Sequence, residues 1–457
     1  MMNSSYRATL GVAACFVLAA TAGAQNQRVS PRPRPQRPVE VPPAVVVLPV
    51  DTTAGDSIRV IIERDLDYGD RVQPVLLDSA MADDVWRPNK RNINFDPLRD
   101  TRAKFAVRAR PISTGLRVEI YDVARKKLLQ AASFRLPRLP RDSVLQAIGR
   151  RDLSARDSLE REWRLAIHGV SDELERWITG TRGAAQTRIV YIDHGKLKIV
   201  DSDGANVQIL PTVGAALSPS WHPSGRSIVY VEADDKGTQI AQYDLRTMKS
   251  QILTASPRGL NISPVYTRDG KSIVWASGMD KPAELLLASA NGNDTTAKRF
   301  VGRTGFETTS PTFSPDGRQV AFISPRPLTP QVYIMNVDGT RLRLLTPVVA
   351  GKRSYRTSPD WSPNGEEVAF MQQMGDFQIW TISVRNRVMK QLTTEGENED
   401  PSWAPDGRHL SITTRRGEIG ADKNIWVLDT RTGRMRQLTH SNDARLSDWS
   451  PILKPNF

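Results

Sequence analysis

The sequence predicts a mainly β protein: a six-bladed β-propeller at the C-terminal end, preceded by a small N-terminal α/β domain. Three observations predict this fold class. A Ser-Pro-x-aromatic motif recurs through the second half of the chain. Its aromatic residues are 42 to 48 residues apart, and similar apolar runs and tight turns follow each copy. A period in the forties with strand-like patterning is typical of propeller blades of four strands each.

The first 24 residues have the features of a signal peptide. Arg7 supplies the positive start, Ala8–Ala20 form a short apolar stretch, and Ala22-Gly23-Ala24 fits the small-x-small cleavage pattern. We therefore expect export to the periplasm, with cleavage after Ala24. Lipidation at Cys15, the only cysteine, is the alternative.

Residues 25–43 form a Pro/Arg-rich tail. Alternating Pro and Arg residues favour an extended polyproline II conformation with a solvated backbone. Both a stiff spacer and a docking peptide that orders on a partner fit this composition.

Residues 44–181 predict a separate α/β domain. Its last helix carries one apolar stripe from Leu159 to Ile178, which we expect to cover a sheet. A basic insert lies near residues 135–156, and residues 182–187 form a linker. The expected elements before that helix are a strand at 44–50, a helix at 57–66, and strands at 75–77, 104–110, 116–121 and 128–134.

The propeller is predicted to span residues 188–457, which allows 45 residues for each of six blades. Residues 188–210 supply three strands without the leading motif, and residues 446–453 supply that motif at the other end. We therefore predict that the C-terminal strand 446–453 completes the first blade and closes the ring. The motif aromatics, expected to pack between neighbouring blades, are Trp221, Tyr266, Phe313, Trp361, Trp403 and Trp449.

Two short segments carry a resemblance to a known family. The junction Thr187-Arg188-Ile189-Val190-Tyr191 and the ending Asp448-Trp449-Ser450-Pro451-Ile452-Leu453, on either side of the blades and behind an α/β domain, resemble the TolB family of the Tol–Pal system. The resemblance covers residues 44–457. The chain departs from the family pattern in its terminal tetrapeptide, its basic insert and its Pro/Arg tail.

The resemblance implies a periplasmic scaffold that supports outer-membrane integrity and constriction at cell division. Such a protein binds the peptidoglycan-associated lipoprotein Pal over one propeller face and faces TolA through its N-terminal segment and domain. The Pal face includes the residues just before each Ser-Pro. The matching residues are Leu260, Asn261, Ser263, Thr309 and Ser310, to which repeat symmetry adds Arg356, Thr357, Glu399, Asp400 and Arg445.

Charge is arranged unevenly near these positions. One blade carries the acidic run Glu397–Asp400, and its neighbour carries the basic run Lys352–Arg356, which together suggest a surface for oriented docking. The formal charge of +13 is otherwise spread along the chain, without zinc-finger spacing or an RNA-binding aromatic signature. We therefore expect no nucleic-acid partner, and we expect a monomer that reaches the outer membrane only through its partners.

The sequence predicts no catalytic residue, metal or cofactor. It lacks a G-x-S-x-G elbow, and no pair of its five histidines has metal-ligand spacing. We expect surface or turn positions for these histidines, which are His168, His194, His222, His409 and His440.

Two other functions remain open. One is a propeller enzyme of the carbohydrate-lyase kind, which would bring titratable groups with shifted pKa values together in the channel, with His222 and His409 pointing inward. The other is a sensor of a cell-wall ligand that has no Tol partner.

Overall fold

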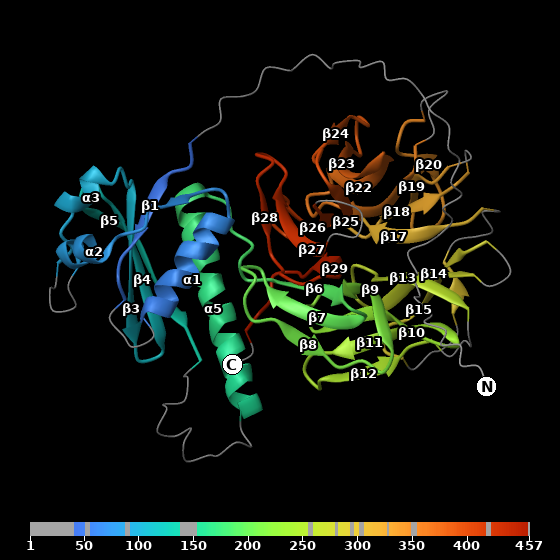
Figure 1. Cartoon of the computed structure of the whole chain (residues 1–457), viewed down its shortest axis with the longest axis horizontal. Helices are drawn as coiled ribbons and strands as arrows, with labels where there is room; N and C mark the ends of the chain where they lie inside the picture. Colours follow the sequence, from blue (N-terminus) through green and yellow to red (C-terminus); the bar gives the residue numbers. More distant parts are fainter. Residues whose placement is uncertain are drawn as a thin grey trace, which may run out of the picture. The chain divides into compact units, whose positions relative to one another are not determined.

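The structure is a computed structural model, drawn in Figure 1. It describes residues 41–50, 55–86, 92–137, 153–254, 259–278, 282–292, 297–300, 306–326, 329–348, 354–416 and 422–455. The predicted signal peptide, Cys15, the tail up to residue 40 and residues 138–152 of the basic insert lie outside these ranges. Within them, no helix combines the length and the apolar character that a membrane span requires.

The α/β domain is built on one five-stranded sheet in the order β2-β1-β3-β4-β5. Strand β1 runs parallel to both β2 and β3, whereas β3, β4 and β5 are joined as antiparallel neighbours. The elements are β1 (Ala44–Val47), α1 (Gly55–Tyr68), β2 (Gln73–Pro74), α2 (Ser79–Val85), α3 (Asp96–Asp100), β3 (Phe105–Ile112), β4 (Gly115–Asp122), β5 (Lys127–Arg135) and α5 (Leu153–Thr179).

Helices cover both faces of this sheet (Figure 1). Val45 and Val47 of β1 pack with α1 and α5, while Val46 and Leu48 pack with α2 and α3. Successive side chains of a strand point to opposite faces, so a strand that is buried on both sides must be apolar at every position. The continuous run of valines in β1 meets this requirement.

Three details of this domain differ from the sequence prediction. No strand forms at 75–77; β2 lies two residues earlier. Helices α2 and α3 were not predicted. Helix α2 buries only Ala82 and Val85, too few residues to make a detectable apolar stripe, and its start depends on Asp78, whose side chain accepts a hydrogen bond from the Met81 N–H at 2.8 Å.

The described part of the propeller contains six four-stranded sheets, which confirms the predicted fold class. We number the blades from 1 to 6 in the order of their innermost strands. Blade 1 comprises β9 (Ala215–Trp221), β10 (Ser227–Asp234), β11 (Gly237–Asp244) and β12 (Lys249–Ile252); blade 2 comprises β13 (Leu260–Tyr266), β14 (Ser272–Gly278), β15 (Glu284–Ser289) and β16 (Lys298–Arg299); blade 3 comprises β17 (Thr309–Phe313), β18 (Gln319–Ser324), β19 (Gln331–Asn336) and β20 (Arg343–Leu344). Blade 4 comprises β21 (Arg356–Trp361), β22 (Glu367–Met374), β23 (Asp376–Ser383) and β24 (Met389–Gln391); blade 5 comprises β25 (Glu397–Trp403), β26 (His409–Arg415), β27 (Lys423–Asp429) and β28 (Met435–Gln437); blade 6 comprises β29 (Ala444–Trp449), β6 (Arg188–Asp193), β7 (Lys196–Asp201) and β8 (Gln208–Leu210).

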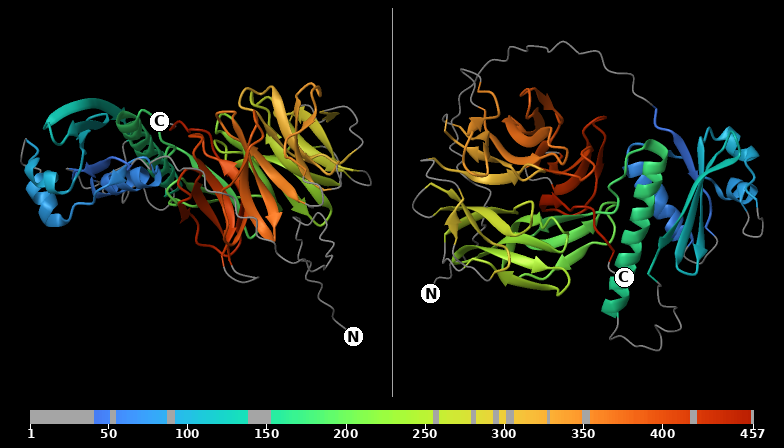
Figure 2. Two further views of the ribbon diagram at one scale, coloured as in Figure 1. Left: turned by 90° about the horizontal axis from the view of Figure 1, so that it is seen from above. Right: turned by 180° about the vertical axis from the view of Figure 1, so that it is seen from behind.

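The ring closes in blade 6. Strand β29 comes from the C-terminal end of the chain and pairs antiparallel with β6, with Ala444 opposite Asp193 and Trp449 opposite Ile189. The six innermost strands contact one another in ring order, from β9 through β13, β17, β21 and β25 to β29 and back to β9. Figure 2 shows the sheets arranged around one axis. Because the ring is closed, blades 1 and 6 contact each other and neither exposes its side to solvent at this point.

The seams between blades are apolar. Trp361 of blade 4 is 3% exposed and packs in one cluster with Ile323 and Ile334 of blade 3. Tyr266 of blade 2 packs in the same way with Val229 of blade 1. The prediction that the motif aromatics fill the space between neighbouring blades is confirmed.

The α/β domain meets blade 6 through buried charges. His168 of α5 is fully buried, and its Nδ1 lies 2.8 Å from an Asp65 carboxylate oxygen of α1, while its Nε2 lies 3.8 Å from Asp201 at the end of β7. Arg164 binds Asp201 and Asp203 at 3.3 and 2.8 Å. Burial alone would lower the pKa of His168, but the carboxylates of Asp65 and Asp201 raise it to about 10.

A second buried cluster joins the domain to blade 5. Asp70, which follows α1, receives hydrogen bonds from His409 Nε2 at 3.2 Å, Arg434 Nη1 at 2.8 Å and Arg436 Nη1 at 3.1 Å. His409 is 2% exposed. The prediction that the histidines occupy surface or turn positions is therefore wrong for His168 and His409, because both are buried by contacts between segments far apart in the sequence.

Candidate functional site

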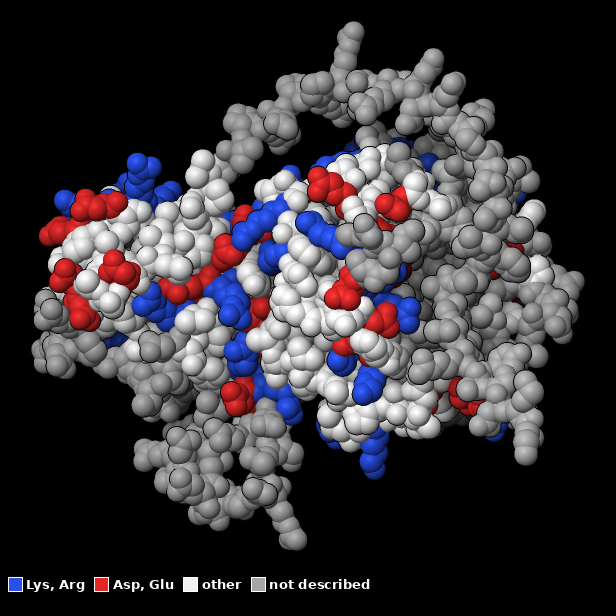
Figure 3. Space-filling model, in the orientation of Figure 1, with Lys and Arg blue, Asp and Glu red and all other residues white. Residues whose placement is uncertain are grey.

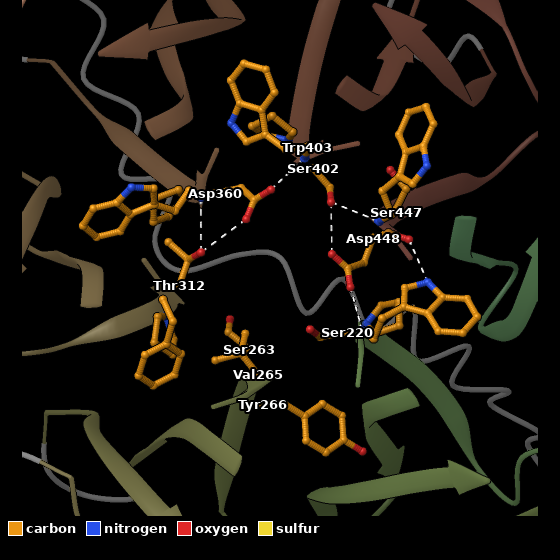
Figure 4. Close-up of a pocket in the computed structure, with 18 of the residues that line it drawn as sticks. Ser220, Ser263, Val265, Tyr266, Thr312, Asp360, Ser402, Trp403, Ser447 and Asp448 are labelled. Atoms are coloured by element: carbon orange, nitrogen blue, oxygen red, sulfur yellow. Dashed lines mark hydrogen bonds between the residues drawn. The ribbon is translucent and has the colours of Figure 1, made fainter. Parts of the chain in front are cut away.

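The axis of the propeller holds a cavity of about 440 Å³ (Figure 4). The repeat motif of all six blades lines it, so each innermost strand contributes equivalent atoms around the ring. We call the residue just before each motif aromatic the channel-ring residue; in the sixth repeat Ser447 stands in place of the motif proline. These residues are Ser220, Val265, Thr312, Asp360, Ser402 and Asp448.

A bulge precedes every channel-ring residue by two positions. At this point each innermost strand changes register against its neighbour. The bulged residue has a φ between 44° and 54°, a region that costs a residue with a side chain about 1 kcal/mol or more. Its recurrence in all six blades shows that the fold imposes it. The bulged residues are Ser218, Ser263, Ser310, Ser358, Asp400 and Leu446.

Channel-ring side chains connect four pairs of neighbouring blades. Each of these four accepts a hydrogen bond from the backbone N–H of the motif aromatic in the following blade. Four such bonds are present: Trp361 N–H to Thr312 Oγ1 at 3.3 Å, Trp403 N–H to Asp360 Oδ2 at 2.7 Å, Trp449 N–H to Ser402 Oγ at 3.0 Å and Trp221 N–H to Asp448 Oδ2 at 2.6 Å.

Two of the channel-ring residues are half-buried carboxylates, Asp360 and Asp448. Asp448 also accepts a hydrogen bond from Ser402 Oγ at 3.0 Å, and Asp360 accepts one from Thr312 Oγ1 at 3.2 Å. Burial raises the pKa of both groups, and the nearby Asp360 helps to raise that of Asp448 to about 7. One side of the channel, from blade 4 to blade 6, therefore carries two carboxyl groups that are hydrogen-bonded to neighbouring blades.

Comparison with known proteins identifies the family to which this propeller belongs. Residues 175–453 match the family described as the TolB β-propeller domain, PD40. The chain belongs to this family, and the resemblance found in the sequence is confirmed.

Individual TolB proteins are distant relatives. The Tol-Pal system protein TolB of Bordetella pertussis is 25% identical over 314 residues, which cover 66% of this chain and 64% of that protein. TolB of Bordetella parapertussis is 26% identical over the same length. The match therefore spans less than two thirds of either relative. The crystal structure of TolB from Acinetobacter baumannii has a TM-score of 0.72 at 22% identity, covers 90% of this chain and 97% of its own, and shares the fold.

The predicted partner-binding residues fall into two groups in this TolB propeller. Asn261 and Arg356 occupy the same repeat position and are 3% and 4% exposed. The Asn261 amide donates to Thr238 O at 2.7 Å, and Arg356 Nη1 donates to Pro347 O at 2.8 Å. Both side chains hold the propeller together and do not face solvent. The others, half-buried on the innermost strands, are Leu260, Ser263, Thr309, Ser310, Thr357, Glu399, Asp400 and Arg445.

The described residues do not show the predicted opposition of an acidic and a basic blade. Glu397 forms an ion pair with Arg415, and Glu399 forms one with Lys423, so blade 5 neutralises its own acids. Arg356 of the basic run is buried, and Lys352 and Arg353 lie outside the described residues. Figure 3 likewise shows basic and acidic groups interspersed on the face that it draws.

Two groups of side chains could approach a metal ion. In each, one ligand atom per residue lies within 4.8 Å of the others: Asp65, His168 and Asp203 in one group, Asp70, His409 and Asp429 in the second. Arginines already bind Asp70, Asp203 and Asp429, the last through two hydrogen bonds from Arg408 of 3.0 and 2.6 Å, and Asp65 pairs with His168. Both groups thus act as ion pairs at the domain junction.

Sequence reasoning missed Asp360 and Asp448, which the structure places in the channel ring. In the aligned repeats they occupy a position that varies among Ser, Val, Thr and Asp, whereas the neighbouring aromatic residue and the proline present in five of the six repeats draw attention. Reading that one column across all six repeats would have revealed a ring of oxygen-bearing side chains with a single exception, Val265.

Proposed function

We propose that this chain is a periplasmic interaction scaffold of the Tol–Pal type. It binds a Pal-like, peptidoglycan-associated lipoprotein at the mouth of the propeller channel, and its N-terminal segment and α/β domain face a TolA-like protein. Through these partners it supports outer-membrane integrity and constriction at cell division. The protein acts as a monomer, without catalysis or a cofactor.

One observation carries the proposal: all six repeats converge on one cavity of about 440 Å³ at the axis of a TolB-family propeller. The Bordetella relatives bear the name of the Tol-Pal system. The residue before each bulge is half-buried on its innermost strand, and these six side chains offer a partner both polar and apolar contacts.

The channel also meets one expectation of the enzyme alternative, since the pKa values of Asp360, Asp400 and Asp448 are raised by burial. Hydrogen bonds within the propeller occupy these carboxylates, as Ser358 Oγ donates to Asp400 at 3.0 Å. Neither histidine required by that alternative points into the channel: His222 Nε2 lies 3.1 Å from Gly270 O, and His409 lies at the domain junction. The scaffold proposal is therefore preferred.

Calorimetry with the purified soluble domain of the same organism's peptidoglycan-associated lipoprotein tests the proposal. We expect binding to the mature chain, and at least tenfold weaker binding to Thr309→Arg, because a long cation replaces a small half-buried side chain on the proposed face. Capture of that lipoprotein from solubilised envelopes at two salt concentrations provides an independent check.

Thr247→Arg is the matched control, since Thr247 is an exposed residue of the turn between β11 and β12, at the opposite end of a blade. It should bind like the unmodified chain. Absence of binding to the unmodified chain at low and high salt would rule out the Pal role and favour the ligand sensor.

A further inference from the structure

The N–H of every motif aromatic points into the channel. In blade 3, Ser314 N–H donates to Gln319 O at 2.9 Å, so Ser314 and Gln319 form a hydrogen-bonded pair of the β17–β18 ladder. Such pairs alternate with non-hydrogen-bonded ones in an antiparallel ladder. Phe313, opposite Val320, therefore directs its N–H away from β18. Because β17 is the innermost strand, that direction is the channel.

The same argument applies around the ring. The residue after each motif aromatic donates to its cross-strand partner in all six blades. Four of the resulting channel-facing N–H groups bind the channel-ring residue of the preceding blade, as described above. Among the described residues, no side chain accepts from the other two, which belong to Tyr266 and Phe313.

Val265 explains the gap at Phe313. It occupies the position from which Thr312, Asp360, Ser402 and Asp448 supply an oxygen to the next blade, and its isopropyl group has none. Figure 4 shows the difference: dashed lines join the labelled residues from Thr312 to Asp448, and none reaches Val265. A channel-facing donor left without an acceptor costs about 1–3 kcal/mol unless water or a ligand binds it.

A cation lies beside the gap. Arg268 follows the motif of blade 2, lines the cavity and donates from Nη2 to Phe313 O at 2.7 Å and from Nε to Ser314 O at 3.3 Å. These acceptors are neutral, and Arg268 forms no ion pair with a carboxylate of the described residues, although its charge partly offsets the effect of burial that raises the pKa of Asp360. The channel is thus asymmetric: blades 4 to 6 present occupied acids, whereas blades 2 and 3 present an N–H donor and an exposed guanidinium.

We propose that the Phe313 N–H, left open by Val265 and flanked by Arg268, is a docking point for a carboxylate that the binding partner inserts into the channel. The partner's oxygen takes the place that the channel-ring side chain occupies in four other seams. A carboxylate fits better than a neutral carbonyl, because only an anion pairs with the Arg268 charge and forms a charge-assisted hydrogen bond. This inference rests on the proposed function and names the chemistry of the contact.

Substitutions at Val265 test it, using the mature chain and the soluble domain of the lipoprotein. Val265→Thr keeps the side-chain shape and supplies the hydroxyl by which Thr312 accepts from Trp361. Val265→Asp supplies a carboxylate, as Asp360 does. Each should fill the docking point from within and weaken binding at least tenfold. Val265→Ala, the matched control, provides no oxygen and should bind within about threefold of the unmodified chain.

A second measurement follows the Phe313 amide itself. The chain has 11 phenylalanines, so selective ¹⁵N-phenylalanine labelling gives a spectrum with few signals. The signal that is missing in Phe313→Tyr belongs to the Phe313 amide. Titration with sodium acetate, against sodium chloride at equal ionic strength, should move the Phe313 amide in the unmodified and Val265→Ala chains. In Val265→Thr the resonance should not respond.

The outcomes separate the two proposals. If the lipoprotein binds the unmodified, Thr and Ala chains equally, the docking point is wrong and the scaffold role stands. If it binds none of them, the scaffold role fails and the acetate titration alone decides: a shift confined to the chains without an oxygen at position 265 supports the docking point. If acetate does not shift the Phe313 amide signal in any of the chains, the docking-point proposal is wrong.

Discussion

The propeller seams and the domain junction are held by opposite means. Between blades, clusters of fully buried apolar side chains make the contact, as Phe370 of blade 4 does with Ile334 of blade 3. Between the α/β domain and blades 5 and 6, buried carboxylates meet histidines and arginines. Apolar packing is non-directional and adds stability in proportion to area. Buried charges add little net stability but make loss of either partner costly.

The difference suggests different tasks. Each seam repeats the same contact six times, so a uniform apolar packing suffices to close the ring. The junction forms once, between units that must meet in one orientation, and paired charges with fixed hydrogen-bond directions select that orientation. Substituting one residue of a blade seam and one residue of the domain junction should therefore show the difference between apolar packing and paired charges.

The largest effect is expected at a seam. Phe370→Ala removes a fully buried ring from the cluster between blades 3 and 4 and should lower the free energy of unfolding by about 4 kcal/mol. Urea unfolding should give the same loss at low and at high salt, because no charge is involved. Leu342→Ala, at a residue 40% exposed, is the control and should change stability by less than about 0.5 kcal/mol. A loss that depended on salt would contradict the apolar assignment.

A somewhat smaller effect is expected at the junction. Asp70→Asn keeps the left-handed backbone (φ 55°), which asparagine tolerates, but removes the charge that faces His409 and Arg436. The loss should be about 3 kcal/mol, because the largely buried Arg436 remains without a counter-charge and His409 keeps only Asp406. Scanning calorimetry should show the α/β domain unfolding separately from the propeller.

The control for that change lies three residues away. Asp67 is 44% exposed and pairs with Arg434 alone, so Asp67→Asn should cost less than about 1 kcal/mol. If Asp67→Asn and Asp70→Asn had equal effects, burial of the junction charges would not matter to its stability.

The sequence was sufficient for the propeller because the relevant signals are local. Each blade carries its own turn, motif aromatic and alternating strands, and six copies of one pattern reinforce one another. Closure by the last motif followed from counting strands; the strand itself begins at Ala444, two residues before the predicted start. Helix α2 escaped prediction because its burial depends on contacts from elsewhere in the domain.

Less of the candidate site than of the fold could be predicted from the sequence. Asn261 and Arg356 are polar residues just before the Ser-Pro motif, so the sequence predicts them at the surface. Neighbouring strands bury both side chains. Val265 is an ordinary strand residue until the channel-ring residues of the other blades show what is missing there. A position whose meaning depends on the next blade cannot be interpreted within its own repeat.

The smallest predicted effect sharpens the comparison through pH. His168 faces Asp65 of α1, Asp201 and Asp203 of blade 6, and Arg164 of its own helix. Its pKa is raised to about 10 in the folded chain, against about 6.5 when unfolded. The native state therefore holds a proton that the unfolded chain has released, and this stabilisation falls as pH rises between these values.

Between about pH 7.5 and 9, we expect the junction to lose about 2 kcal/mol of stability. Raised carboxyl groups such as Asp172, with a pKa of about 7, titrate mostly below this range. His168→Gln should be less stable at pH 7.5 and should lose the His168 share of the alkaline decline, leaving only the part that His409, whose pKa Asp406 and Asp70 also raise, contributes, whereas Phe370→Ala should retain the full decline. Unfolding of the three chains in urea across this range provides the measurement. Parallel pH profiles for the unmodified and His168→Gln chains would mean that the imidazole is neutral, and that the junction depends on its arginines alone.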